Sequence, residues 1–158
     1  MRPEHIDHIV VCSTGVMAGI ASVQNRTQHI MDQARCHTPS ETLSWNYESV
    51  MGGRILQTRK LLANTLLDNG IDHEEEWLDR RVLSSNYQGP VIHIVVTKPD
   101  GTPEYIRSDE VDGRIFQEAL AATMGIPGFS RVERVGGEIR FDGGFSDSAM
   151  IEYARNTL

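Results

Sequence analysis

Two short segments, far apart in the chain, contain the residues best suited to chemistry. The first is Val11-Cys12-Ser13-Thr14-Gly15, which follows an apolar run and precedes a predicted helix. A serine on a strand-to-helix turn has the geometry of a nucleophile elbow. The second is Phe141-Asp142-Gly143-Gly144, in which a carboxylate lies between a predicted strand end and two glycines. Because Gly143 and Gly144 permit a sharp turn and a close approach of backbone to ligand, we expect Asp142 to be presented rather than buried.

A serine hydroxyl is a weak nucleophile unless a base takes its proton. The usual base is a histidine late in the chain, and none of the six histidines occupies such a setting. Asp142 is therefore the best candidate for the base of Ser13. An α/β sheet can bring both residues together at the carboxyl ends of its strands.

The residues after the serine could stabilise an oxyanion. The predicted helix begins just beyond Ser13, so the backbone N–H of Thr14 would point at a developing negative charge, with support from the helix dipole. Gly15 would supply the small residue that a tight turn requires. These features together suggest a serine hydrolase whose base is an aspartate.

Composition limits the alternatives. A chain of 158 residues with net charge −7 is expected to form one domain, residues 1–158, and carries no basic footprint for nucleic acid. Cys12 and Cys36 are not spaced as metal ligands and are expected to be reduced thiols of a cytoplasmic protein. The apolar run near the N-terminus is too short for a membrane span, and neither a metal nor another cofactor is expected.

Hydrophobic patterning predicts alternating elements. We expect a fully buried strand over 6–12, helices over 16–34, 55–67, 73–83, 112–124 and 148–156, and strands over 90–98 and 103–108, with a hairpin over 132–141. Within helix 55–67, Arg59 and Lys60 would face water. His93 is interpreted as a packed strand histidine rather than a catalytic one. This order predicts an α/β fold in which helices flank a mixed sheet.

The chain resembles the bacterial patatin-like phospholipases along nearly its whole length. Residues 11–15 look like the G-x-S-x-G elbow of that family, and Asp142-Gly143-Gly144 looks like its D-G-G or D-G-A motif. Residues 95–97, 122–127 and 137–140 resemble the segments between these motifs. The resemblance implies a three-layer α/β/α fold. It also implies a Ser–Asp dyad, Ser13 and Asp142, that cleaves acyl esters through an acyl-enzyme.

The chain departs from the family pattern in three places. Val11 replaces the first glycine of the elbow and could crowd the helix behind it. No glycine-rich oxyanion loop precedes Ser13, and Gly52-Gly53-Arg54 has the composition of that loop but the wrong position. The chain also stops one helix after Asp142, where the family usually continues with another strand.

A domain shortened at its N-terminus would lack the first strand, so the sheet edge near residues 6–12 would be exposed. An exposed edge favours pairing with a second copy. A lipid substrate would bring the protein into peripheral contact with a membrane.

Three interpretations remain open at this point. The first is a patatin-like acyl hydrolase acting on lipid or other acyl esters. The second is a catalytically impaired member of the same fold that acts as a binding or subunit partner. The third is a small α/β binding module in which the two motifs coincide by chance.

Overall fold

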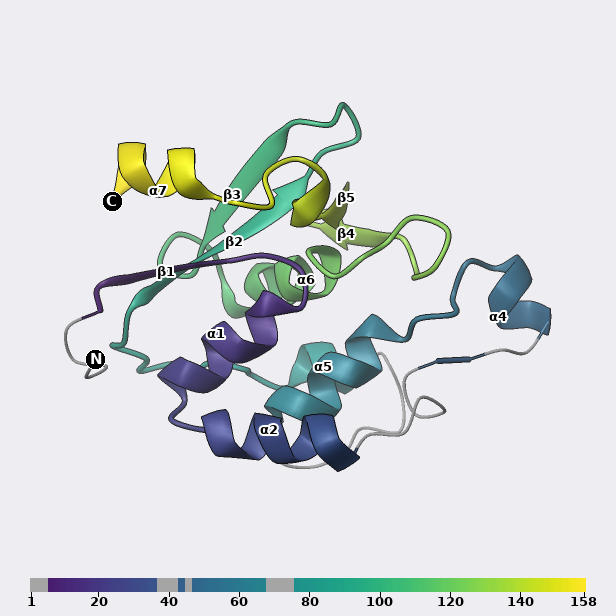
Figure 1. Ribbon diagram of the computed structural model, residues 1–158, viewed down its shortest axis with the longest axis horizontal. Coiled ribbons are helices and arrows are strands. Elements are labelled where there is room, and N and C mark those ends of the chain that lie inside the picture. Colours follow the sequence, from purple (N-terminus) through teal and green to yellow (C-terminus); the bar gives the residue numbers. More distant parts are fainter. Residues whose placement is uncertain (1–5, 37–42, 45–46, 68–75) are drawn as a thin grey trace.

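Strand β2 (Val91–Thr97) is the centre of the sheet and pairs with three other strands. The structure is a computed structural model that describes residues 6–36, 43–44, 47–67 and 76–158. In these residues a mixed, open sheet is flanked by helices (Figure 1), which confirms the predicted α/β class and the mixed sheet. The strands are β1 (His8–Val11), β2, β3 (Pro103–Arg107), β4 (Glu133–Val135) and β5 (Glu138–Asp142). The α-helices are α1 (Gly15–Val23), α2 (Thr27–Cys36), α4 (Tyr47–Met51), α5 (Thr58–Leu66), α6 (Gly113–Ala122) and α7 (Ile151–Thr157), with short 3-10 helices η2 (Glu76–Asp79) and η3 (Gly143–Phe145).

The pairing register of β2 places two strands end to end along one of its edges. Strand β3 runs antiparallel beside residues 93–97 of β2 and fills one edge there. Strand β1 is parallel to β2, with Val11 opposite Ile94, and β5 is antiparallel to it, with Asp142 opposite Val96. Since β3 occupies the first edge, β1 and β5 must share the second, and they run toward each other. Their carboxyl ends meet beside Val95.

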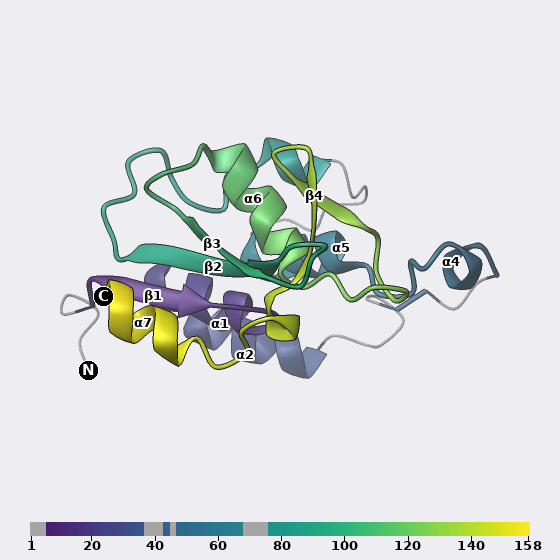
Figure 2. The ribbon, with the colours of Figure 1, turned by 90° about the horizontal axis from the view of Figure 1, so that it is seen from above.

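One face of the sheet is covered by the main hydrophobic core. Alternate residues of β2 point into this core, together with apolar side chains of α1, α5 and α6 (Ile92, Ile94, Val96, Val16, Ile20, Leu62, Leu66, Phe116 and Leu120). Figure 1 shows α1, α2 and α5 on this side of β1 and β2, while Figure 2 shows β1 lying beside β2 and α4 extending away from the other elements.

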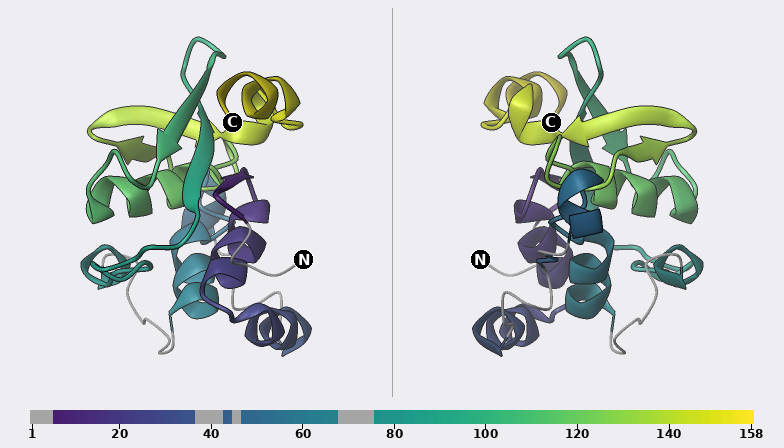
Figure 3. Two further views of the ribbon diagram at one scale, coloured as in Figure 1. Left: turned by 90° about the vertical axis from the view of Figure 1, so that its left-hand side faces the viewer. Right: turned by 90° about the vertical axis from the view of Figure 1, so that its right-hand side faces the viewer.

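The opposite face of the sheet carries the C-terminal helix α7. In both views of Figure 3 the β2–β3 hairpin and α7 lie at the top and α2 at the bottom. His93 on β2 is fully buried, and its two ring nitrogens contact His8 Nδ1 at 3.0 Å and the Tyr153 hydroxyl at 2.7 Å. Tyr153 stacks on Tyr105 of β3, with ring centroids 3.6 Å apart. These contacts join α7, which has no buried residue, to the sheet. The interpretation of His93 as a packed residue is confirmed.

The strand and hairpin predictions for 90–98, 103–108 and 132–141 are confirmed, as are the helices within 112–124 and 148–156. Asp112 caps α6, because its Oδ1 accepts hydrogen bonds from the backbone N–H groups of Arg114 at 2.9 Å and Ile115 at 2.8 Å.

Several predictions at the N-terminal half were wrong. The strand near residue 8 is only partly buried, because β1 lies at the edge of the sheet in the described residues: Val11 is its one fully buried residue, and Ile9 packs against the core while partly exposed. The single helix expected over 16–34 is two helices, since Asn25 adopts a left-handed conformation at φ 56° and ends the first one.

Two more helix predictions need correction. Helix α5 starts at Thr58, and Arg59 does not face water: it is 9% exposed and forms a bidentate ion pair with Glu133, which is 1% exposed. That pair joins α5 to β4 in the interior. Of the helix expected over 73–83, residues 73–75 lie outside the described residues, and the remainder forms only η2 followed by irregular chain.

The buried histidine predicts an acid-sensitive stability. Burial lowers the pKa of His93, with further lowering from His8 and Arg107, while Asp109 and Glu110 oppose it. An unfolded chain therefore binds a proton more readily than the folded one, so this contribution to stability is complete well above pH 6.5 and is lost as pH falls below that value.

We expect the free energy of unfolding, measured by urea titration from pH 8 to pH 5, to fall more steeply in wild type than in His93→Gln. Glutamine keeps a donor and an acceptor but does not titrate. Identical pH profiles for the two proteins would contradict this account.

Candidate active site

Ser13 lies on the tight turn between β1 and α1. The turn is closed by backbone hydrogen bonds from Gly15 N–H to the Cys12 carbonyl at 3.0 Å and from Val16 N–H to the Ser13 carbonyl at 3.2 Å. Ser13 itself has φ 49°, in the left-handed region that residues with a side chain rarely occupy. Such a conformation costs on the order of 1 kcal/mol or more and persists only where surrounding contacts impose it. A strained serine on a strand-to-helix turn is the arrangement of a nucleophile elbow.

The Ser13 hydroxyl donates a hydrogen bond of 2.7 Å to Asp142 Oδ2. The other carboxylate oxygen, Oδ1, accepts from the backbone N–H of Gly144 at 2.8 Å, so the carboxylate is fixed with one oxygen facing the serine. The structure thus brings together the two residues that the sequence proposed as a dyad, while their catalytic roles stay a prediction.

The environment of the aspartate differs from the expectation. Asp142 is 6% exposed, so the carboxylate is buried and not presented to solvent. It ends β5, where it is paired with Val96 of β2, and its backbone N–H donates to the Gly125 carbonyl at 3.0 Å. Ser13 is half-buried, and Thr14 and Gly15 are exposed. An incoming molecule would therefore meet the serine first, with the aspartate behind it.

The two glycines after Asp142 have different functions. A Cβ built on Gly143 would lie 2.2 Å from the Val95 carbonyl oxygen, so only glycine allows this approach to β2. The sequence suggested a close approach to a ligand at this glycine. The structure shows instead that Gly143 closely approaches the protein's own backbone at Val95. Gly144 contributes its N–H to the carboxylate.

Gly15 is not required in the way we expected. A Cβ at Gly15 would have no heavy atom within 4 Å, and the positive φ of the turn falls on Ser13. The glycine that relieves crowding lies further along α1. A Cβ at Gly19 would lie 2.5 Å from Val11 Cγ1, so Gly19 makes room for the Val11 side chain.

Two buried threonines form hydrogen bonds with the main chain of Ser13 and Asp142. The sequence predicted a role for neither of them. Thr123 Oγ1 accepts a hydrogen bond from the Ser13 backbone N–H at 3.0 Å and donates one to the Val95 carbonyl at 2.5 Å. Thr97 Oγ1 donates to the Asp142 carbonyl at 2.7 Å. Both threonines lie in the segments 95–97 and 122–127 that resemble the family, and that position was the available signal.

The neighbouring cysteine is not a competing nucleophile. Cys12 is only partly buried, and burial raises the pKa of its thiol, with further raising by the carboxylates of Asp142 and Asp147. A thiol must ionise to attack, so these influences keep Cys12 protonated near neutral pH. Ser13, with a hydrogen-bonded carboxylate, is the better candidate.

The segment Gly52-Gly53-Arg54 lies elsewhere in the fold. Arg54 N–H donates to the Ser49 carbonyl at the end of α4, and a Cβ at Gly53 would contact the backbone of Gly128 at 3.5 Å. Helix α4 extends away from the start of α1 (Figure 1). No hydrogen bond joins this segment to Ser13 in the residues that the structure describes, so it does not replace an oxyanion loop there.

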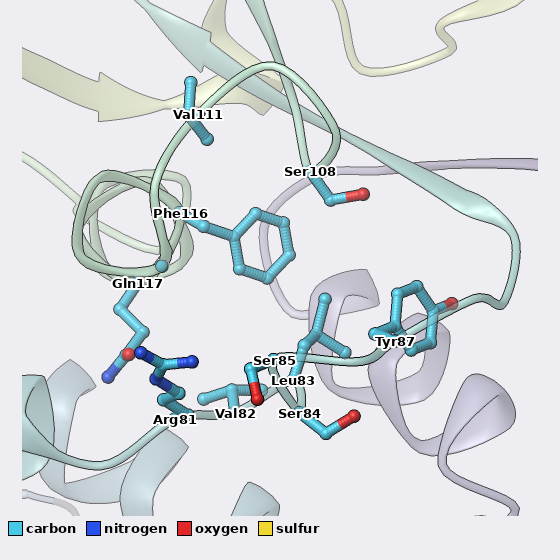
Figure 4. Close-up of a pocket in the computed structure, with 11 residues that line it drawn as sticks. Arg81, Val82, Leu83, Ser84, Ser85, Tyr87, Ser108, Val111, Phe116 and Gln117 are labelled. Carbon is cyan, nitrogen blue, oxygen red and sulfur yellow. The ribbon is translucent and has the colours of Figure 1, made fainter.

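One cavity in the described part of the chain is separate from the dyad. It has a volume of about 280 Å³ and lies between residues 81–87 and the start of α6. Figure 4 shows Phe116 directed into its centre, and Arg81 and Gln117 are among the residues that line it. Neither Ser13 nor Asp142 lines it. We assign the chemistry to the dyad because its geometry is specific, whereas the cavity presents no nucleophile paired with a base.

In the described part of the chain no group of three or more His, Cys, Asp or Glu side chains could hold a metal ion. None of the described helices combines the length and hydropathy needed to cross a lipid bilayer.

Comparisons with models of protein families, with curated proteins and with solved structures found no match to this chain.

The glycine contacts predict a large effect on stability for one alanine substitution and almost none for another. Gly143→Ala should lower the free energy of unfolding by about 1–3 kcal/mol, because the new methyl group meets the rigid backbone of β2. Gly15→Ala should change it by less than about 0.5 kcal/mol, since the space around it is open. Chemical denaturation of both variants measures this, and a larger loss for Gly15→Ala would contradict the geometry.

Proposed function

We propose that this protein is a serine acyl hydrolase of patatin-like architecture that uses a Ser13–Asp142 dyad. The single observation that carries the proposal is the 2.7 Å hydrogen bond from Ser13 Oγ to Asp142 Oδ2 on a strained strand-to-helix turn. Serine and aspartate side chains lie close in many proteins. A serine held at positive φ beside a fixed carboxylate combines a nucleophile with its base.

The reaction would proceed in two steps. As Ser13 Oγ attacks the ester carbonyl carbon, its proton passes to Asp142 Oδ2. The tetrahedral intermediate collapses, the alcohol leaves with that proton, and the acyl group stays on Ser13. A water molecule then attacks the acyl-enzyme, giving a proton to Asp142, and the carboxylic acid is released as Ser13 regains its proton.

An oxyanion donor is available next to the nucleophile. The Thr14 residue is exposed at the start of α1, and its backbone N–H has no hydrogen-bond partner among the described residues. The Ser13 N–H is already engaged by Thr123. The oxyanion would therefore rely on Thr14 N–H and the positive end of the α1 dipole.

The substrate class follows from the chemistry and from the surroundings of the dyad. An ester supplies the carbonyl that the mechanism needs, and Phe145, 63% exposed just after Asp142, supports an apolar acyl chain. A lipid ester, peripheral membrane contact and the three-layer patatin arrangement all belong to this proposal. Pairing with a second copy along the edge of β1 belongs to it too, since β1 pairs only with β2 in the described residues.

A second candidate is a binding protein of the same fold without catalysis. The cavity in Figure 4 favours it, because it offers apolar and polar walls away from Ser13. Under this alternative Ser13 and Asp142 would serve only to join β1 to β5.

Reaction with a fluorophosphonate probe tests the proposal. Wild type should become covalently labelled, Ser13→Ala should not, and Asp142→Asn should label at least about 100-fold more slowly because it lacks the base. In-gel fluorescence gives the rates.

Cys12→Ala is the matched control and should label like wild type, since the thiol takes no part. Circular dichroism establishes that each variant is folded. Folded wild type that remains unlabelled would overturn the hydrolase and leave the binding protein.

A further inference from the structure

A gap in strand pairing lies directly beneath the candidate dyad. Strand β1 ends opposite Ile94 and β5 ends opposite Val96, so no strand residue is paired with Val95 on that edge of β2. Ile94 and Val96, the β2 residues opposite these two strand ends, lie about 7 Å apart along β2. Unpaired backbone groups inside a sheet are costly, so something else must satisfy the Val95 carbonyl.

The side chain of Thr123 fills this gap. Its hydroxyl donates to the Val95 carbonyl at 2.5 Å and accepts from the Ser13 N–H at 3.0 Å. A carbonyl can only accept and a backbone N–H can only donate, so the direction of both bonds is fixed. Thr123 is fully buried at the end of α6, and its own N–H donates to the Ala119 carbonyl at 2.9 Å. The hydroxyl is thus held by a helix.

We infer that Thr123 is a positioning residue that keeps the Ser13 elbow in its reactive geometry by bridging it to β2. This inference rests on the proposed function, because it assigns Thr123 a task in that reaction. Thr123 does not touch the reacting atoms. It acts through the main chain of Ser13.

The strain at Ser13 explains why such a bridge is needed. With φ 49° the residue tends to relax toward an ordinary conformation, which would swing the hydroxyl away from Asp142. Three contacts oppose this movement: the Thr123 bond to its N–H, the Val16 bond to its carbonyl and the Asp142 bond to its hydroxyl. The hydroxyl must break its own bond during reaction, so only the two main-chain contacts persist throughout.

The experiment removes only the bridging hydroxyl. Thr123→Val keeps the shape of the side chain, and Thr123→Ser keeps the hydroxyl. Thr65→Val is the matched control, because Thr65 is also a buried threonine that donates to a carbonyl, that of Leu61, on α5. We would measure the second-order rate of fluorophosphonate labelling, kcat and KM for a p-nitrophenyl ester, and hydrogen exchange of the Ser13 amide.

We expect Thr123→Val to label about 10- to 100-fold more slowly, with the loss in kcat rather than KM, because the nucleophile is misplaced. Its Ser13 amide should exchange faster. Thr123→Ser should stay within about threefold of wild type, and Thr65→Val should be unchanged, since neither disturbs the elbow. If Thr123→Val does not fold, Thr123→Cys, a weaker donor and acceptor, should show an intermediate loss.

Three outcomes would overturn the inference. One is a folded Thr123→Val that labels as fast as wild type. Another is an equal slowing in Thr123→Val and Thr65→Val, which would indicate a general loss of stability. The third is unchanged hydrogen exchange of the Ser13 amide in Thr123→Val. This measurement tests the Thr123 contact even if wild type is not labelled, a result that would contradict the proposed function alone.

Discussion

The structure depends on the meeting of two strands, end to end, along one edge of β2. Strand β3 fills the other edge, so β1 and β5 approach each other from opposite directions and stop on either side of Val95. Residues that follow these strand ends are forced together. For this reason Ser13 Oγ lies 2.7 Å from Asp142 Oδ2, although the two residues are 129 positions apart in sequence.

The contacts around this junction support one another. Gly143 allows the chain after β5 to pass close to the Val95 carbonyl, and Thr97 fixes the main chain of Asp142. On the other side, Gly19 makes room for Val11 beneath the elbow. Each contact involves β2 or a strand end beside it. The positive φ of Ser13 is therefore supported by the sheet and not by the elbow sequence alone.

The sequence predicted the elements that depend on local patterns and missed those that depend on distant partners. The apolar run of β2 and the glycine turn before Glu138 specify a strand and a hairpin directly. The burial of Arg59 could not be read locally, because its partner Glu133 lies on a different element. The burial of Asp142 likewise depends on the pairing of β5 with β2, a distant partner. The contacts of Thr123 could not be read from its own segment, since they exist only once β1 and β5 leave a gap beside Val95.

The central claim is that Ser13 acts as a nucleophile toward an acyl ester, and trapping the acyl-enzyme tests it most directly. Wild type mixed briefly with a p-nitrophenyl ester, quenched in acid and digested would be examined by mass spectrometry. The account predicts a peptide containing Ser13 that has gained the mass of the acyl group, and no such gain in Ser13→Ala. A folded wild type that releases no nitrophenol and carries no acyl group, or one that carries it on Cys12, would contradict the account.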